Sequence, residues 1–210
     1  MTEKGNPNFI SQAWLVLVLA LCFGGLLAGI QITLGPTIEA NKLNETLERV
    51  PELVFGAAHA EELSQSGLEI NSLSVGVEKA GRTVRYSVFE TKSDGHLAGW
   101  VTKTTGQGYA DKIEILIGFD PRVEKITGLF VLDQKETPGL GNKIIENAWR
   151  SQFVDKSTSQ PLAPVKGQSA APNEIDAITG ATISSRAVTN IINTTVADLR
   201  QPLAAKAKGQ

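Results

Sequence analysis

The sequence predicts an α+β domain that follows a single N-terminal membrane-spanning helix. Three observations predict this class: a long uncharged apolar run near the N-terminus, a central series of strand-like segments, and helical periodicity in the C-terminal part. The chain has 210 residues, which is enough for one compact domain and an appendage, since domains commonly contain about 100 to 200 residues.

The composition excludes several kinds of site. Lys and Arg are scattered and the net charge is −2, so the sequence lacks the basic patch typical of nucleic-acid binding. Cys22 is the only cysteine, which rules out an intramolecular disulfide and a cysteine-based metal centre. His59 and His96 stand apart beside polar or small residues, and we interpret both as surface side chains. We predict no metal site and no catalytic residue, and any redox chemistry requires an imported cofactor.

Residues 13–35 form the predicted transmembrane helix, after a short N-terminal segment at 1–12. No charged residue occurs between Gly5 and Ile38, and roughly 20 apolar residues in a helix cross the hydrocarbon core of a bilayer. Trp14 stands at one end, where an indole ring prefers the membrane interface. A cleaved signal peptide would have a shorter apolar core and a small-residue cleavage site, which this run lacks.

Two glycines in this helix, Gly25 and Gly29, form a small-xxx-small pair that allows another membrane helix to approach closely. The alternative is the ordinary glycine content of membrane helices. The charges do not determine the orientation, because Lys4 on one side is matched by Lys42 and Arg49 on the other. We expect the glycine face and the segment that follows to contact partner helices.

Residues 36–51 are predicted to form a stalk helix, with Leu43, Leu47 and Val50 on one face and Pro51 at its end. A folded domain is then predicted over 52–200. Residues 51–80 are weakly patterned. The segments after them alternate, are rich in β-branched residues and are separated by short turns, which predicts an antiparallel sheet of four strands at 83–90, 96–104, 112–119 and 123–133.

Helices are predicted to flank this sheet. The segment 142–153 has a helical period that places Ile144, Ile145, Ala148, Trp149 and Phe153 on one side. A loop follows over 151–173, with one short edge strand around Val165. The last helix is predicted from about Ser184 through Leu199, and 201–210 as a flexible tail.

Three glycine-containing loops are candidates for a binding site. The first, TTGQGYADK at 104–112, contains Gly108, where a ligand could approach the backbone. The second, ETPGLGNK at 136–143, contains a Pro138-Gly139 pair that fits a type II turn. The third is DAITGATISSRAV at 176–188, in which hydroxyl side chains precede a helical pattern.

The hydroxyls of the third loop, on Thr179, Thr182, Ser184 and Ser185, stand where a helix begins. The free N–H groups of a first helical turn attract an anion, and Arg186 in that turn can add positive charge to a phosphate site. The alternative is simple capping, for which one Ser or Thr suffices. The residues alone nominate a phosphate pocket and leave both interpretations open.

The same loop, DAITGATIS, resembles the flavinylation motif Dxx(S/T)GAT of FMN-binding domains in bacterial respiratory complexes. ETPGLG resembles the second signature of those domains, and the order of membrane helix, sheet, GxGYxxxI, ETPGLG, helix and TGAT loop is also similar. Residues 9–200 resemble the RnfG subunits of Rnf electron-transport complexes and, more distantly, the NqrC subunits of sodium-pumping NADH:quinone reductases.

The resemblance implies that Thr182 carries FMN through a phosphoester, attached by a separate Mg-dependent flavin transferase that uses FAD. Other residues match motif positions that serve the transferase or shape the turn, namely Asp176, Thr179, Gly180 and Ala181. The second signature would contact the flavin ring through Thr137, Gly139 and Leu140. Glu136 either belongs to this contact or hydrogen-bonds its own turn. Gly108 and Tyr109 match the third loop, although Tyr109 could equally be a sheet-edge packing residue.

The function implied is that of a covalently flavinylated electron-transfer subunit in a membrane-bound, ion-translocating ferredoxin:NAD oxidoreductase. Its partners would be the other membrane and redox subunits and the transferase, and its soluble domain would lie outside the cytoplasmic membrane, with the N-terminus inside. The alternatives are an NqrC subunit of the quinone reductase, and a non-enzymatic membrane-anchored module for sensing or assembly. We do not expect the isolated chain to catalyse the reaction of the whole complex.

Overall fold

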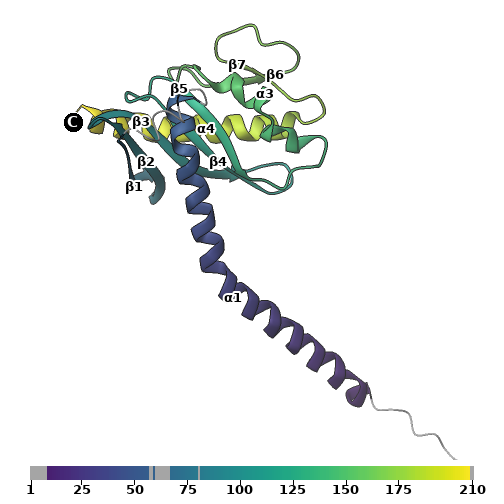
Figure 1. The fold of residues 1–210 in the computed structure, drawn as a ribbon. Helices are drawn as coiled ribbons and strands as arrows, with labels where there is room; N and C mark the ends of the chain where they lie inside the picture. Colours follow the sequence, from purple (N-terminus) through teal and green to yellow (C-terminus); the bar gives the residue numbers. More distant parts are fainter. Residues whose placement is uncertain (1–8, 57–58, 60–66, 80, 209–210) are drawn as a thin grey trace, which may run out of the picture. The chain divides into compact units, whose positions relative to one another are not determined.

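The computed structural model describes residues 9–56, 59, 67–79 and 81–208. The chain divides into two compact units, Met1–Glu45 and Thr46–Gln210, and Figure 1 shows the elements of both. Most of the predicted N-terminal segment 1–12 and the last two residues of the predicted tail lie outside the described residues.

Helix α1 spans Phe9–Phe55. It contains a stretch that is long and apolar enough to cross a membrane, and the side chains of that stretch are exposed, as the sequence predicts. The predicted stalk at 36–51 belongs to the same helix, and Pro51 does not end it. The helix continues for another turn because Leu53 and Val54 are buried against the sheet, and this burial offsets the cost of a proline inside a helix.

The second unit is built on a five-stranded antiparallel sheet whose strands follow one another in sequence order. The α+β class is therefore confirmed. The sequence missed one strand, in the weakly patterned region, because only Val75 of its alternating apolar residues is fully buried. The strands are β1 (Leu68–Lys79), β2 (Arg82–Ser93), β3 (His96–Gln107), β4 (Lys112–Phe119) and β5 (Ile126–Asp133).

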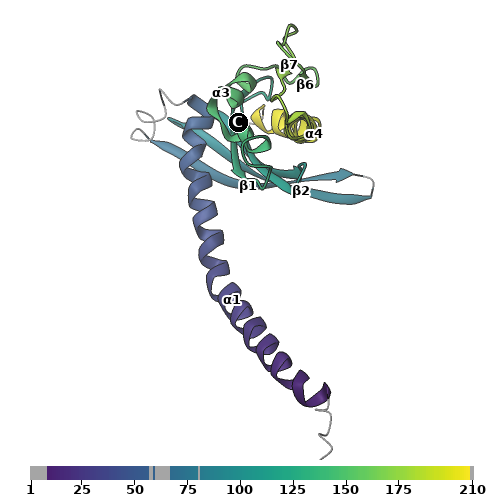
Figure 2. The same ribbon diagram turned by 90° about the vertical axis from the view of Figure 1, so that its right-hand side faces the viewer.

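Each face of the sheet has its own apolar cluster, because side chains alternate along every strand. The larger cluster joins the sheet to helix α4 (Thr182–Ala207), which lies along one face (Figure 2). The smaller cluster joins the other face to the last turns of α1. It consists of Val50, Leu53, Val54, Phe89, Val101 and Leu116.

Two glycines in the sheet leave space for the backbone at the end of α1 to approach closely. Gly118 of β4 and Gly128 of β5 are paired across the two strands, and a Cβ atom at Gly118 would lie 2.3 Å from the carbonyl oxygen of Leu53. Thr127 Oγ1 donates a hydrogen bond to the same carbonyl at 2.6 Å. This contact satisfies a carbonyl that has no partner within the helix, so the end of α1 is fixed on the sheet by both packing and hydrogen bonding.

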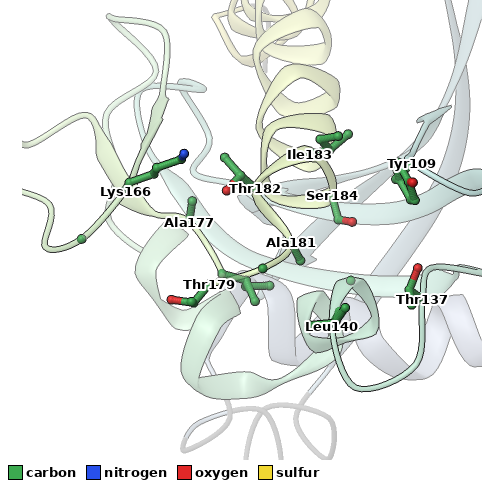
Figure 3. A pocket seen from close by; sticks show the side chains of 14 residues that line it. Tyr109, Thr137, Leu140, Lys166, Ala177, Thr179, Ala181, Thr182, Ile183 and Ser184 are labelled. Carbon is green, nitrogen blue, oxygen red and sulfur yellow. The ribbon is translucent and has the colours of Figure 1, made fainter.

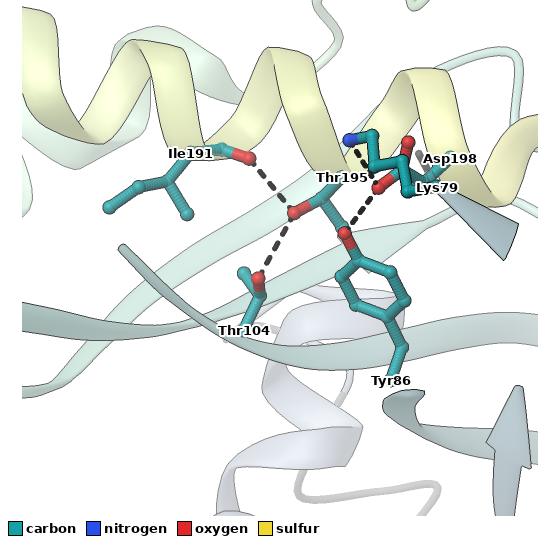
Figure 4. A network of polar contacts seen from close by, with 6 residues as sticks. All are labelled: Lys79, Tyr86, Thr104, Ile191, Thr195 and Asp198. Atoms are coloured by element: carbon teal, nitrogen blue, oxygen red, sulfur yellow. Dashed lines mark hydrogen bonds and ion pairs between the residues drawn. The ribbon is translucent and has the colours of Figure 1, made fainter. Parts of the chain in front are cut away.

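On the face of the sheet that α4 covers, a polar network joins this helix to the strands (Figure 4). Asp198 accepts from the phenol of Tyr86 and forms an ion pair with Lys79 at 2.8 Å, while Thr195 donates to Thr104 at 3.1 Å. Burial raises the pKa of Tyr86, and its hydrogen bond to Asp198 adds to the increase. The phenol therefore remains a donor across the physiological pH range, which stabilises the contact of α4 with the sheet.

Helix α4 is longer than predicted at both ends. It begins at Thr182 rather than Ser184, and it continues through Pro202 to Ala207, within the segment 201–210 that we expected to be a flexible tail. Leu203 has no exposed surface, so burial of this side chain compensates for the backbone hydrogen bond that Pro202 cannot make.

The predicted helix at 142–153 consists of three short pieces, η1 (Gly141–Ile145), α3 (Asn147–Arg150) and η2 (Ser151–Phe153). Ile144, Trp149 and Phe153 are buried as expected, whereas Ile145 and Ala148 are exposed, because the breaks change the direction of successive turns. The strand expected around Val165 is β6 (Ala163–Val165), which pairs in parallel with β7 (Glu174–Asp176).

We predict that Gly118→Ala lowers the free energy of unfolding by about 2 kcal/mol and Tm by roughly 4–8 °C, because the new methyl group overlaps the backbone of α1. Thermal unfolding of the full chain in detergent measures the change. The control is Gly76→Ala in β1, where a Cβ atom would lie 3.2 Å from the exposed methyl group of Thr83. Equal Tm values for the two variants would contradict this account.

Candidate functional site

The three glycine-containing loops meet beside the N-terminus of α4, around a pocket of about 740 Å³ (Figure 3). Eight of the residues that the sequence nominated line it together: Tyr109, Thr137, Leu140, Thr179, Gly180, Ala181, Thr182 and Ser184. The loops are far apart in sequence, so the fold, rather than any local motif, assembles this pocket.

A single buried carboxylate, that of Glu136, connects the three loops. Its Oε1 atom accepts from the backbone N–H groups of Tyr109 at 2.9 Å and Ala110 at 3.0 Å. Its Oε2 atom accepts from the hydroxyl of Ser184. The side chain of Glu136 thus accepts hydrogen bonds from the two neighbouring loops. The alternative, in which Glu136 hydrogen-bonds its own turn, does not describe this side chain. With a relative exposure of 4%, this charge requires the donors that surround it.

The second loop has the predicted type II turn. Leu140 N donates to the carbonyl of Thr137 at 3.1 Å, and Gly139 has φ +75°, which is the position and sign that a type II turn requires of its third residue. Gly180 has φ +82° and therefore also adopts the left-handed backbone conformation that favours glycine. Its hypothetical Cβ atom would lie 3.0 Å from Leu140, so the second and third loops are in close contact.

The hydroxyls of the third loop have different environments. Ser184 donates to Glu136, and Ser185 accepts from Ile178 N at 3.0 Å and donates to the carbonyl of Ala181 at 3.1 Å. Both serines are buried. Within the described residues, neither Thr179 nor Thr182 has a side-chain hydrogen bond, and both line the pocket. Two hydroxyls are therefore structural and two are available to a ligand.

Thr182 is the first residue of α4, and the N-cap residue Ala181 has no capping side chain. The simple capping interpretation therefore does not account for these hydroxyls. Hydrogen bonding along the helix backbone begins at Ser185, whose N–H donates to the carbonyl of Ala181 at 3.1 Å. The preceding N–H groups and the helix dipole favour an anion next to Thr182.

Asp176 does not line the pocket but fixes the segment that leads into it. Its Oδ1 atom accepts from Ser169 N, its own N–H donates to Gln152 at 2.8 Å, and its carbonyl accepts from the indole of Trp149 at 2.9 Å. These bonds connect β7 with α3 and η2. Its role in the free chain is to hold the third loop in place.

The other nominated residues lie outside the lining, and several lining residues were missed. Arg186 is exposed one turn beyond Thr182, while Gly108 packs against Glu136, where a Cβ atom would lie 2.5 Å from Oε1. Sequence reasoning missed Gly141, Lys166, Gly167, Ala177, Ile178 and Ile183. Gly141 lies within the ETPGLG signature and Ala177, Ile178 and Ile183 within the DAITGATIS motif, so these four could have been included.

The lining suits a phosphorylated ligand with a large apolar portion. A hydroxyl, a helix N-terminus and the ammonium group of Lys166 stand on one side, and the exposed side chains of Tyr109, Leu140 and Ile183 supply apolar surface. A volume of about 740 Å³ is within the usual range for cofactor sites. The phosphate of FMN fits the hydroxyl, helix N-terminus and ammonium group, and its isoalloxazine ring fits the apolar side chains.

Comparisons with known proteins agree with this chemistry. Residues 108–197 match the FMN-binding domain family. The chain is 35% identical over 167 residues to the G subunit of the Na(+)-translocating ferredoxin:NAD(+) oxidoreductase complex of Acetobacterium woodii, covering 79% of this chain and 78% of that protein. It is also 35% identical over 104 residues to the G subunit of the ion-translocating oxidoreductase complex of Methanosarcina acetivorans, but covers only 53% of its length.

Solved structures share the fold. The crystal structure of Shewanella oneidensis NqrC superposes with a TM-score of 0.64 at 19% identity, over 81% of this chain and 100% of that one. The C subunit of the Na(+)-translocating NADH-quinone reductase from Parabacteroides distasonis gives a TM-score of 0.58 at 21% identity, over 80% and 95%. At these identities the comparison concerns the fold alone.

We predict that Glu136→Ala destabilises the domain by about 3 kcal/mol, because the buried hydroxyl of Ser184 and two partly buried backbone N–H groups lose their acceptor. Thermal unfolding gives the loss of stability, and amide hydrogen exchange at Tyr109 and Ala110 should accelerate. Glu146→Ala, which removes an exposed carboxylate from the same region, serves as the control. Unchanged exchange at both amides would exclude the connecting role of Glu136.

Proposed function

This chain belongs to the RnfG family, the electron-transfer subunits with an FMN-binding domain in Rnf-type ion-translocating oxidoreductase complexes, and we propose that it carries its FMN as a phosphoester on Thr182. One observation supports this assignment above the others. Thr182 is the residue that combines an uncommitted hydroxyl, a place in the pocket wall and the first position of α4.

The proposed attachment is a transfer of FMN from FAD by a separate Mg-dependent flavin transferase. A bond forms between Thr182 Oγ1 and the FMN phosphorus, the phosphoanhydride bond to the AMP portion of FAD breaks, and AMP leaves while the hydroxyl proton is released. The product is a phosphodiester with one negative charge. The N–H groups at the start of α4 are placed to stabilise this charge.

The bound flavin supplies the capacity to accept and donate electrons, and the protein supplies the binding and orientation. Thr137, Leu140 and Tyr109 line the pocket at the ends of the other two loops and are the proposed contacts of the ring. We propose that electrons pass through this site between neighbouring redox subunits of an Rnf-type complex, in which α1 anchors the domain to the membrane. The NqrC subunit of the quinone reductase is the weaker candidate, because the solved NqrC structure is 19% identical whereas the G subunit from Acetobacterium woodii is 35% identical over 167 residues.

We further propose that the folded unit lies on the extracytoplasmic side of the membrane. The family assignment is the support for this orientation, whereas the charges that flank the apolar helix do not discriminate. The donor and acceptor subunits would then have to place their redox groups on the same side.

Thr182→Ala is expected to abolish covalent FMN, because the other hydroxyls in the first turn of α4, on Ser184 and Ser185, are committed to structural hydrogen bonds. The full chain is co-expressed with an active flavin transferase, and denaturing-gel fluorescence and intact mass report the attached flavin. Thr194→Ala, an exposed hydroxyl on the same helix, should retain full loading. Peptide mapping that places the FMN mass on Thr179 would refute the assignment.

The orientation predicts that a cysteine at Ser159, an exposed position of the folded unit, reacts with a membrane-impermeant maleimide in intact cells. Cys22→Ser removes the native thiol from the background. Labelling that occurs only after the cells are opened would place the domain in the cytoplasm instead.

A further inference from the structure

A lysine that the motifs do not include faces the proposed attachment site. Lys166 lines the same pocket as Thr182, and in Figure 3 its ammonium end is directed into the pocket toward the side where Thr182 lies. Among the lining residues in the described part of the chain, Lys166 alone carries a charge.

The position of Lys166 is determined by the small parallel sheet. Lys166 follows the last residue of β6, and the carbonyl of that residue, Val165, accepts from the N–H of Ala177 at 2.8 Å. Val165 is also paired with Asp176 across the sheet. The backbone that carries the lysine is therefore bonded directly to the backbone that leads into the TGAT loop.

The alternative cation is Arg186, which the sequence nominated for the phosphate. It is exposed, one turn farther along α4, and does not line the pocket. The helix N-terminus supplies only a partial charge to the anion site, so the full positive charge of Lys166 on the same side of the pocket is the natural complement to a phosphodiester.

We propose that Lys166 is the cation that pairs with the phosphate of the flavin ester on Thr182 and positions this phosphate against the start of α4. The inference rests on the proposed function. A lysine ammonium is suited to this role, because it binds phosphate as a point charge on a flexible stem and does not require a fixed geometry. Because the side chain is exposed, salt should weaken the pairing.

The first test measures protection of the amine. The full chain, with and without covalent FMN, is treated with a limiting amount of an acetylating reagent, and peptide mass spectrometry gives the extent of reaction at Lys166. Pairing with the phosphate should lower the reactivity of Lys166 at least severalfold in the loaded chain, and high salt should restore part of it. Lys125, an exposed lysine in the turn between β4 and β5, should react equally in both samples.

The second test measures the rate of covalent FMN incorporation with purified transferase, FAD and Mg²⁺. Lys166→Gln should slow incorporation about fivefold, which corresponds to about 1 kcal/mol for an ion pair at a partly exposed site, and Lys166→Arg should restore most of the rate. Arg186→Gln and Lys125→Gln should each have a smaller effect than Lys166→Gln.

The outcomes distinguish a failure of the role of Lys166 from a failure of FMN attachment to Thr182. Flavin on Thr182 with equal Lys166 reactivity in loaded and unloaded chains would overturn the role of Lys166 and leave the attachment site intact. A slower rate without protection would also overturn it, because the lysine would then act in docking of the transferase. A wild-type chain that gains no FMN mass would overturn both.

Discussion

The arrangement of the site depends on the buried carboxylate of Glu136. A charge with 4% relative exposure is stable only where donors surround it. Its donors come from the β3–β4 turn and from α4, which also meet through the hydrogen bond between Thr195 and Thr104. The backbone must also come close: Cβ atoms at Gly108 and Gly141 would lie 2.5 Å and 3.0 Å from the carboxylate oxygens. The two glycines and the carboxylate therefore form one constraint, which brings the walls of the pocket together.

The same constraint explains why hydroxyls that are close in sequence differ in role. Ser184 is committed to Glu136, and Ser185 is committed to the turn before the helix through Ile178. With these bonds satisfied, the turn is stable without a capping side chain at Ala181, and Thr182 retains an unbonded hydroxyl at the helix start. The free hydroxyl at the proposed attachment site therefore results from structural bonds made by its neighbours.

Much of the fold could be predicted because its signals are local. Strand β4 was predicted with its observed limits at residues 112 and 119, since it is rich in β-branched residues that recur at every second position from Ile113 to Ile117. The turn at Gly139 follows from a Pro-Gly pair. Strand β1 was missed because it is largely exposed. Lys166 was missed for a different reason: it lies 16 residues before Thr182 in the sequence, and only the parallel pairing of β6 with β7 brings it to the pocket. Local sequence patterns do not indicate which strands pair with each other.

The exposure of the pocket walls gives a physical reason for the proposed covalent link. Tyr109, Leu140 and Ile183 are 62%, 44% and 55% exposed, so the apolar side chains that a flavin ring would contact belong to the outer surface of the domain. Noncovalent affinity depends on the apolar area that a ligand removes from water, and a site at the surface removes less of this area than an enclosed cavity does. Deeper burial would improve retention but would separate the ring from redox partners. The proposed ester bond to Thr182 would retain the cofactor and leave the ring accessible, which is the combination that an electron relay between subunits requires.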